Sequence, residues 1–237
     1  MRRTNFLYII VFLILWFLVI NSWANTPTLP DPITQKTNEE NKEFGRITSD
    51  YGPRNVESGN TNPHKGIDYA LAKGGRGYCV ESGDVKKINI RSGYNDSNIT
   101  IGNWRYFHIA DDYANNDYAI KIYYDQPVLD KNGKSTGKTT DIIVYREKKN
   151  NKWETIRALH VSDYPIFKFK DPGNNNYEIT TSNYVGKNEW VFCARDYPPL
   201  NDTAGDHLHI DYNDGIKNPL QFICHKNRDR FELPLLI

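Results

Sequence analysis

From Phe44 onward the chain consists of short runs of strand-favouring residues, separated by clusters of Gly, Asn, Asp and Pro. The runs include CVESGDVKKINI, YAIKIYY, TDIIVYRE, WETIRALHV and EWVFCA. Branched and aromatic side chains favour strands, whereas the intervening residues favour turns. No window after the first 24 residues sustains the apolar spacing of an amphipathic helix. The sequence therefore predicts a mainly β fold, with a hairpin turn at KKNNK between Ile142 and Ile156.

The N-terminus has the pattern of an export signal. Arg2 and Arg3 precede an unbroken apolar run from Phe6 to Ile20, and small residues follow up to Ala24. We expect residues 1–24 to be a signal peptide that is removed after Ala24. The alternative is an uncleaved N-terminal anchor, because the run and the residues after it approach the ~20 residues that span a bilayer.

The rest of the composition limits the possible partners. Residues 25–43 are polar, contain three prolines and show no periodicity, which is typical of a tether. The 30 basic and 29 acidic residues give a net charge of +1, so no global charge favours nucleic acid or a membrane surface. The three cysteines lack the spacing of a structural zinc site. Two of them can form a disulfide in an oxidising compartment, and burial of free thiols is the equal alternative.

Two short motifs carry the candidate chemistry. TNPHKGIDYA contains His64 and Asp68, and Gly66 between them favours a loop that leads into a strand. GDHLHIDY contains His207 and His209, which point to the same face if the stretch is a strand. Each motif alone is a weak signal. Together they supply two histidines and one carboxylate, the ligand set of a hydrolytic zinc, and leave one histidine as a general base or an oxyanion stabiliser.

The chain contains, in this order, GRITSDYGPRN, HKGIDYA, YCVESGDVKKI, and DHLHIDY with NPLQFI after it. This order closely resembles the lysostaphin-type zinc metallopeptidases, which cut peptidoglycan peptides. The resemblance covers about residues 45–85 and 185–222. It implies a two-layer antiparallel β-sheet with a groove for an extended peptide. It also implies that His64, Asp68 and His209 bind Zn²⁺ and that His207 is catalytic.

The family has a further active-site histidine in a strand that reads approximately Tyr-x-His-Leu, and two residues here match it. WRYFHI offers His108, which we favour, and IRALHVSDY offers His160. With His108 the metallopeptidase domain, residues 44–237, contains a β-rich central insertion around residues 111–183. With His160 the insertion lies between about Asn89 and Thr140. An insertion of this length could act as an autoinhibitory lid over the site.

The resemblance implies an exported endopeptidase, periplasmic or extracellular, that hydrolyses peptide bonds in peptidoglycan crosslinks through a metal-activated water. The alternative is a non-catalytic module of the same fold that binds the wall or activates other hydrolases. Retention of all four motif residues favours the enzyme. The expected partner is a peptidoglycan peptide, with no nucleic acid and with membrane contact only through an uncleaved N-terminal segment. Tyr51, Trp104 and Tyr106 either line the groove or pack in the core.

Overall fold

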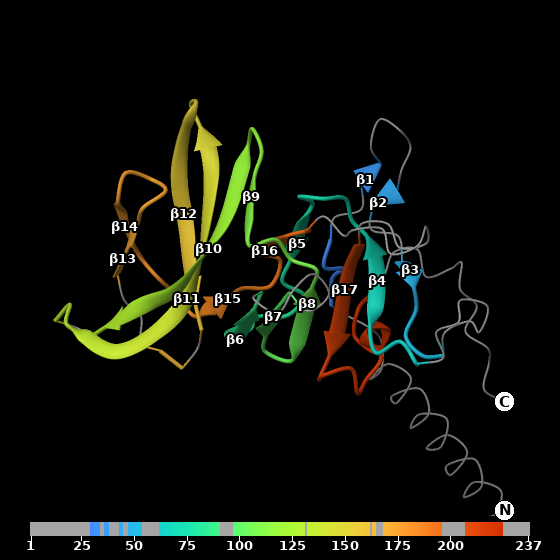
Figure 1. The fold of residues 1–237 in the computed structure, drawn as a ribbon. Helices are drawn as coiled ribbons and strands as arrows, with labels where there is room; N and C mark the ends of the chain where they lie inside the picture. Colours follow the sequence, from blue (N-terminus) through green and yellow to red (C-terminus); the bar gives the residue numbers. More distant parts are fainter. Residues whose placement is uncertain are drawn as a thin grey trace, which may run out of the picture. The chain divides into compact units, whose positions relative to one another are not determined.

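Figure 1 shows the structure, a computed structural model that describes residues 29–33, 36–37, 43–44, 47–53, 62–90, 97–130, 132–161, 163–164, 168–195 and 207–224. The chain divides into two units, Asp31–Pro219 and the terminal segments Met1–Pro30 with Leu220–Ile237. The predicted signal segment lies outside the described residues, as does most of the predicted tether. Within the described residues, no helix is long and apolar enough to cross a membrane.

The prediction of a mainly β, antiparallel fold is confirmed. The largest sheet has seven strands in the order β15-β6-β7-β8-β17-β4-β3 (Figure 1). These strands are β3 (Ile47–Ser49), β4 (Ile67–Ala70), β6 (Gly83–Asn89), β7 (Asn98–Ile101), β8 (Trp104–Phe107), β15 (Tyr184–Val185) and β17 (His207–Tyr212).

A second sheet has four strands in the order β12-β11-β10-β9. They are β9 (Asp112–Ala114), β10 (Tyr118–Leu129), β11 (Ser135–Lys149) and β12 (Lys152–His160). Shorter elements are the pairs β1 (Lys36–Thr37) with β2 (Glu43–Phe44), β5 (Arg76–Tyr78) with β16 (Trp190–Cys193), and β13 (Lys168–Asp171) with β14 (Tyr177–Thr180), and the 3₁₀ helix η2 (Pro219–Gln221).

The seven-stranded sheet has one apolar face, which forms the core. Alternation along each strand sends every second side chain to that face. Its fully buried members include Ile67, Tyr69, Ile99, Ile101, Trp104, Tyr106, Leu208 and Ile210. Phe192 of β16 packs against this face, with its ring centroid 5.7 Å from that of Tyr106. The polar residues between the core positions must therefore share the opposite face, where the candidate site lies.

Two aromatic residues that could have lined a groove are core residues instead. The hydroxyl of Tyr106 accepts the backbone N–H of Val80 at 2.9 Å. The indole N–H of Trp104 donates to Glu81 Oε2 at 3.0 Å. Each polar atom has a partner inside the fold, so packing explains both side chains.

The hairpin predicted at KKNNK joins β11 to β12. Lys149 pairs with Lys152 across a two-residue turn, Asn150–Asn151. Both asparagines have positive φ angles, 51° and 61°. A turn of this kind matches the twist of two paired strands, and asparagine tolerates its left-handed backbone.

After β8 the chain leaves the seven-stranded sheet, forms β9 to β14 and returns as β15. We call residues 112–180 the central lobe. It falls where the sequence predicts a central insertion if His108 is the family histidine. That it is an insertion relative to a family stays a prediction.

A buried carboxylate holds the hairpin β13–β14 to the rest of the central lobe. Asp171 is fully buried and accepts hydrogen bonds from Arg146 Nε at 2.9 Å and from Arg146 Nη2. Thr155 Oγ1, the Gly173 N–H and the Tyr123 hydroxyl also donate to it, at 2.8, 2.9 and 3.1 Å. Burial raises the pKa of Asp171, but these hydrogen bonds and the Arg146 charge outweigh it and hold the pKa below its ordinary value.

Replacing this carboxylate is expected to destabilise the protein strongly. Asp171→Asn keeps the side-chain shape but leaves the Arg146 charge buried without its counter-ion, a change that typically costs about 3–5 kcal/mol. The free energy of unfolding in urea measures the loss. Lys168→Gln is the control, since it breaks the exposed Lys168–Glu178 pair of the same hairpin and should change little. Equal effects of the two substitutions would contradict the role of Asp171.

The same variant gives a pH test. The pKa of Asp171 in the folded state is below the ordinary aspartate value of 3.8, so its contribution is complete above about pH 4. The contribution is lost as the pH falls through the folded-state pKa. The difference in unfolding free energy between wild type and Asp171→Asn should therefore be constant from pH 5 to 7 and shrink below about pH 4. A difference that does not depend on pH would exclude this electrostatic origin.

Candidate metal centre

Strand pairing brings the two sequence motifs together. Asp68 of β4 lies directly opposite His209 of β17 in the antiparallel register. His64 lies just before β4 and is fixed by a backbone pair with Gly52, with N–O distances of 2.7 and 2.9 Å. Residues 145 positions apart in the chain, His64 and His209, thus lie within hydrogen-bonding distance of each other.

Three candidate ligand atoms form a compact triangle. His64 Nε2 lies 3.0 Å from His209 Nδ1 and 3.3 Å from Asp68 Oδ1, and the last two atoms are 2.7 Å apart. A tetrahedral zinc ion with bonds of ~2.0–2.1 Å separates its ligands by roughly 3.3 Å. Two imidazole nitrogens and one carboxylate oxygen at these distances form a group that could hold a metal ion.

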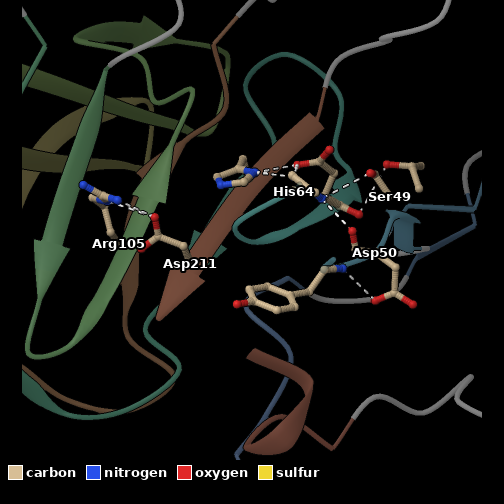
Figure 2. Close-up of polar contacts among 9 residues, drawn as sticks. Ser49, Asp50, His64, Arg105 and Asp211 are labelled. Atoms are coloured by element: carbon tan, nitrogen blue, oxygen red, sulfur yellow. Dashed lines mark hydrogen bonds and ion pairs between the residues drawn. The ribbon is translucent and has the colours of Figure 1, made fainter. Parts of the chain in front are cut away.

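The backbone fixes which nitrogen of His64 faces the cluster. His64 Nδ1 lies 2.8 Å from the carbonyl oxygen of Asp50, and Ser49 Oγ is 3.2 Å away (Figure 2). A carbonyl only accepts, so we assign the proton to Nδ1, which leaves the lone pair on Nε2. A metal-binding histidine typically donates its other N–H to a carbonyl or carboxylate in this way.

Asp68 is held in its charged form. Burial raises the pKa of its carboxyl group, but the hydrogen bonds with His209 and His64 outweigh burial and hold the pKa well below the ordinary value. The carboxylate therefore supplies a negative charge to the triangle at neutral pH. A cation is favoured beside such a charge when the neighbouring imidazoles are neutral.

Two more histidines lie beside the triangle. The rings of His108 and His207 meet edge to face, with centroids 4.6 Å apart, and His108 is 6.3 Å from His209. His108 is buried and has a left-handed backbone, φ 59°, a conformation that costs about 1–3 kcal/mol in a residue other than glycine. Its N–H donates to Ser97 O at 2.9 Å, and its carbonyl accepts the Arg195 N–H at 2.8 Å. These bonds keep the ring beside His207.

His160, the alternative to His108, lies on a different sheet. It is the last residue of β12 in the central lobe and is completely buried. Its Nε2 lies 3.0 Å from the carbonyl oxygen of Tyr164, and burial lowers the pKa of its ring. The structure therefore brings His64, Asp68, His108, His207 and His209 together and places His160 elsewhere. The catalytic and metal-binding roles of these residues stay predictions.

Sequence reasoning missed three residues on the same face. The Phe107 ring meets His209 edge to face, with centroids 5.0 Å apart. The Arg105 guanidinium lies 4.7 Å from the Phe107 ring centroid and donates to Asp211 from Nε at 3.1 Å and from Nη2 at 2.5 Å (Figure 2). The residue spacing could have identified these residues. Asp211 follows His209 by two positions in β17, and Arg105 precedes Phe107 by two positions in β8. The two strands pair, so all four side chains lie on one face.

The cysteines are free thiols in the structure. Cys79 and Cys193 are buried, and burial raises their pKa to about 11 and about 12. Cys224 is free and exposed. Of the two alternatives that the sequence left open, the structure shows buried thiols rather than a disulfide.

Comparison with known proteins gives a distant likeness to a solved structure. No protein-family model matches the chain, and no curated protein matches it. A crystal structure of a zinc-containing peptidase from Vibrio cholerae is similar at a TM-score of 0.31 and 15% sequence identity. The match covers 81% of this chain and 40% of that one, so the chain spans less than half of that protein's length.

Gly66 provides a direct test of the geometry of the candidate site. A Cβ at this position would lie 2.6 Å from the ring of His209 and 2.4 Å from the carbonyl oxygen of Ile210. Gly66→Ala should displace the His209 ring and weaken zinc binding by at least about tenfold. This is the lower end of the loss in metal affinity that follows when a group that orients a metal ligand is changed. Calorimetric titration of the purified protein with zinc measures this.

Gly137→Ala is the matched control. Gly137 lies in the central lobe with a φ of 78°, and nothing lies within 4 Å of its missing Cβ. The substitution should lower stability through backbone strain and leave the zinc affinity unchanged. Equal zinc affinities of wild type and Gly66→Ala would contradict the placement of His209 in the site.

Proposed function

We propose that this chain is a zinc-dependent endopeptidase. The observation that supports it most is the convergence of two imidazole nitrogens and one ionised carboxylate oxygen on one sheet face, with two further histidines beside them. This donor set suits zinc, which hydrolytic enzymes hold with histidine and carboxylate ligands. The Asp50 carbonyl behind His64 is the support that such a ligand requires.

His64, Asp68 and His209 would hold the metal. When bound there, zinc supplies Lewis acidity toward a carbonyl oxygen and lowers the pKa of a water molecule. The side chains of Asp68 and His209 keep 14% and 16% of their exposure, whereas that of His64 is buried. A peptide that lies on the same face of the sheet would meet the site without unfolding the sheet.

The neighbouring histidines would handle protons. His207 and His108 share an edge-to-face contact, and the His108 ring centroid is 6.3 Å from that of His209, so a peptide held at the metal would lie near both rings. One can stabilise the developing oxyanion through its N–H while the other protonates the leaving amine. Proton transfer by a positioned side chain contributes typically ~10²- to 10⁴-fold in rate.

The proposal for the substrate and the compartment rests on the sequence. The order of motifs resembles peptidases that cut peptidoglycan, and the N-terminal segment has the features of an export signal. We therefore propose that the substrate is a peptide crosslink of peptidoglycan and that the protein acts outside the cytoplasm. A non-catalytic module that binds the wall is the outcome if the folded protein holds no metal and hydrolyses nothing.

Substitution of individual histidines tests this function. Wild type from Asn25 on should bind about one zinc ion per chain, as a three-ligand site predicts, and lower the turbidity of purified cell walls. His64→Ala and His209→Ala should lose both properties. His108→Gln should keep the zinc and lose wall lysis by ~10²- to 10⁴-fold. Metal content by mass spectrometry and the lysis rate are the measurements.

His160→Gln is the control, because glutamine can still donate to the Tyr164 carbonyl. It should keep both the zinc and the activity. Loss of lysis in His160→Gln without loss of fold, together with full activity of His108→Gln, would reverse the assignment of the two histidines. Absence of zinc and lysis in folded wild type would support the binding module.

A further inference from the structure

One backbone segment links the central lobe to His108. Residues 190–195, which we call the bracing segment, consist of β16 and the two residues after it. On one side the segment pairs with β5. On the other side its Cys193 carbonyl accepts the Ala110 N–H at 2.9 Å, and its Arg195 N–H donates to the His108 carbonyl at 2.8 Å. The bracing segment is thus the partner of the stretch that carries His108.

Within the described residues, Tyr145 and Arg157 of the central lobe donate hydrogen bonds to backbone carbonyls of this segment. The hydroxyl of Tyr145, on β11, donates to the Val191 carbonyl at 2.7 Å in a fully buried position. Arg157, on β12, donates to the Trp190 carbonyl and to Glu189. The Arg157 guanidinium also lies 4.4 Å from the Tyr145 ring centroid. The lobe therefore bonds directly to backbone carbonyls of the bracing segment.

Aromatic packing adds to these hydrogen bonds. The Trp190 ring meets the rings of Tyr118 and Tyr145 edge to face, with centroids 5.4 and 5.1 Å apart. Arg76 of β5 stacks over both Tyr118 and Trp190, at 3.8 and 4.5 Å from the ring centroids. Edge-to-face pairs and cation–π contacts both depend on orientation, so they define one position of the segment relative to the lobe.

His108 depends on such support. Its φ of 59° is a left-handed conformation that is unfavourable for a residue other than glycine and persists when the surroundings hold it. The Arg195 N–H provides one of the two backbone hydrogen bonds described at this residue, and the Ser97 carbonyl provides the other. A shift of the bracing segment would therefore move the His108 backbone and, with it, the ring beside His207.

We propose that the central lobe is a brace that fixes His108 through the bracing segment, with Tyr145 as its positioning residue. The catalytic consequence rests on the proposed function, whereas the effect on the His108 ring does not. A lid would hold activity down, and loosening it would raise the rate. Loosening a brace should lower kcat and leave KM nearly unchanged, because the binding face is not altered.

Tyr145→Phe tests the brace, since it removes the hydroxyl that bonds to Val191 and keeps the ring. Tyr123→Phe is the matched control, because it removes a hydroxyl of the same lobe that bonds to Asp171 instead. The first readout is the NMR signal of the His108 ring in the full mature chain loaded with zinc, assigned from its absence in His108→Gln. Tyr145→Phe should shift this signal and leave those of His64 and His209 in place. Tyr123→Phe should shift none of them.

The second readout is the rate of peptide hydrolysis. Tyr145→Phe should lower kcat about 5- to 50-fold with KM unchanged, within the ~10²-fold that a misplacement of 1 Å costs. An unchanged His108 signal in folded Tyr145→Phe, or a raised kcat, would overturn the proposal. If Tyr145→Phe does not fold, Arg157→Gln carries the same test at a less buried position. A shifted His108 signal in Tyr145→Phe, together with a wild-type protein that hydrolyses no peptide, would leave the brace in place and refute only the proposed function.

Discussion

The antiparallel pairing of β17 with β4 is the interaction on which the rest of the site depends. It sets His209 opposite Asp68, and a slip of β17 by one residue would turn His209 to the buried face and away from Asp68. The apolar residues that alternate with them fix this register, because Leu208, Ile210, Ile67 and other core residues must stay out of water. The core residues thus determine where Asp68 and His209 of the triangle lie, because they fix the register of the two strands.

The sequence predicted the elements that local pattern controls. Alternation in HLHID placed His207 and His209 on one face, and the two asparagines at the end of β11 defined a hairpin. The likeness of the motifs to a known family suggested that His64, Asp68 and His209 would meet, which no short-range pattern could show. Their meeting requires strand order, and strand order is set by packing over the whole chain.

Other features could not be predicted from the sequence. His108 and His160 both follow strand-like runs, and only the course of the chain shows that one lies directly after β8 of the seven-stranded sheet and the other at the end of β12 in the central lobe. Residue propensities do not predict the left-handed backbone of His108 either, because this conformation depends on hydrogen bonds with Ser97 and Arg195. Burial of Trp104 and Tyr106 was one of two open alternatives, and only the tertiary packing distinguishes them.

The central lobe contributes hydrogen bonds that hold parts of the chain outside the seven-stranded sheet. Its buried Asp171 keeps one hairpin in place, and its Tyr145 and Arg157 bond to the segment that supports His108. The site therefore combines a ligand triangle fixed by the sheet register with a histidine held by contacts outside that sheet. Two different parts of the fold would control metal binding and proton transfer.

The central claim is that His64, Asp68 and His209 bind a metal ion. The most direct measurement is anomalous X-ray scattering at the zinc edge from crystals of the mature chain grown with zinc. A zinc ion held by this site should give one strong peak bonded to His64 Nε2, His209 Nδ1 and Asp68 Oδ1 at about 2.0–2.2 Å. A peak at other residues, or none within reach of these three atoms, would contradict it.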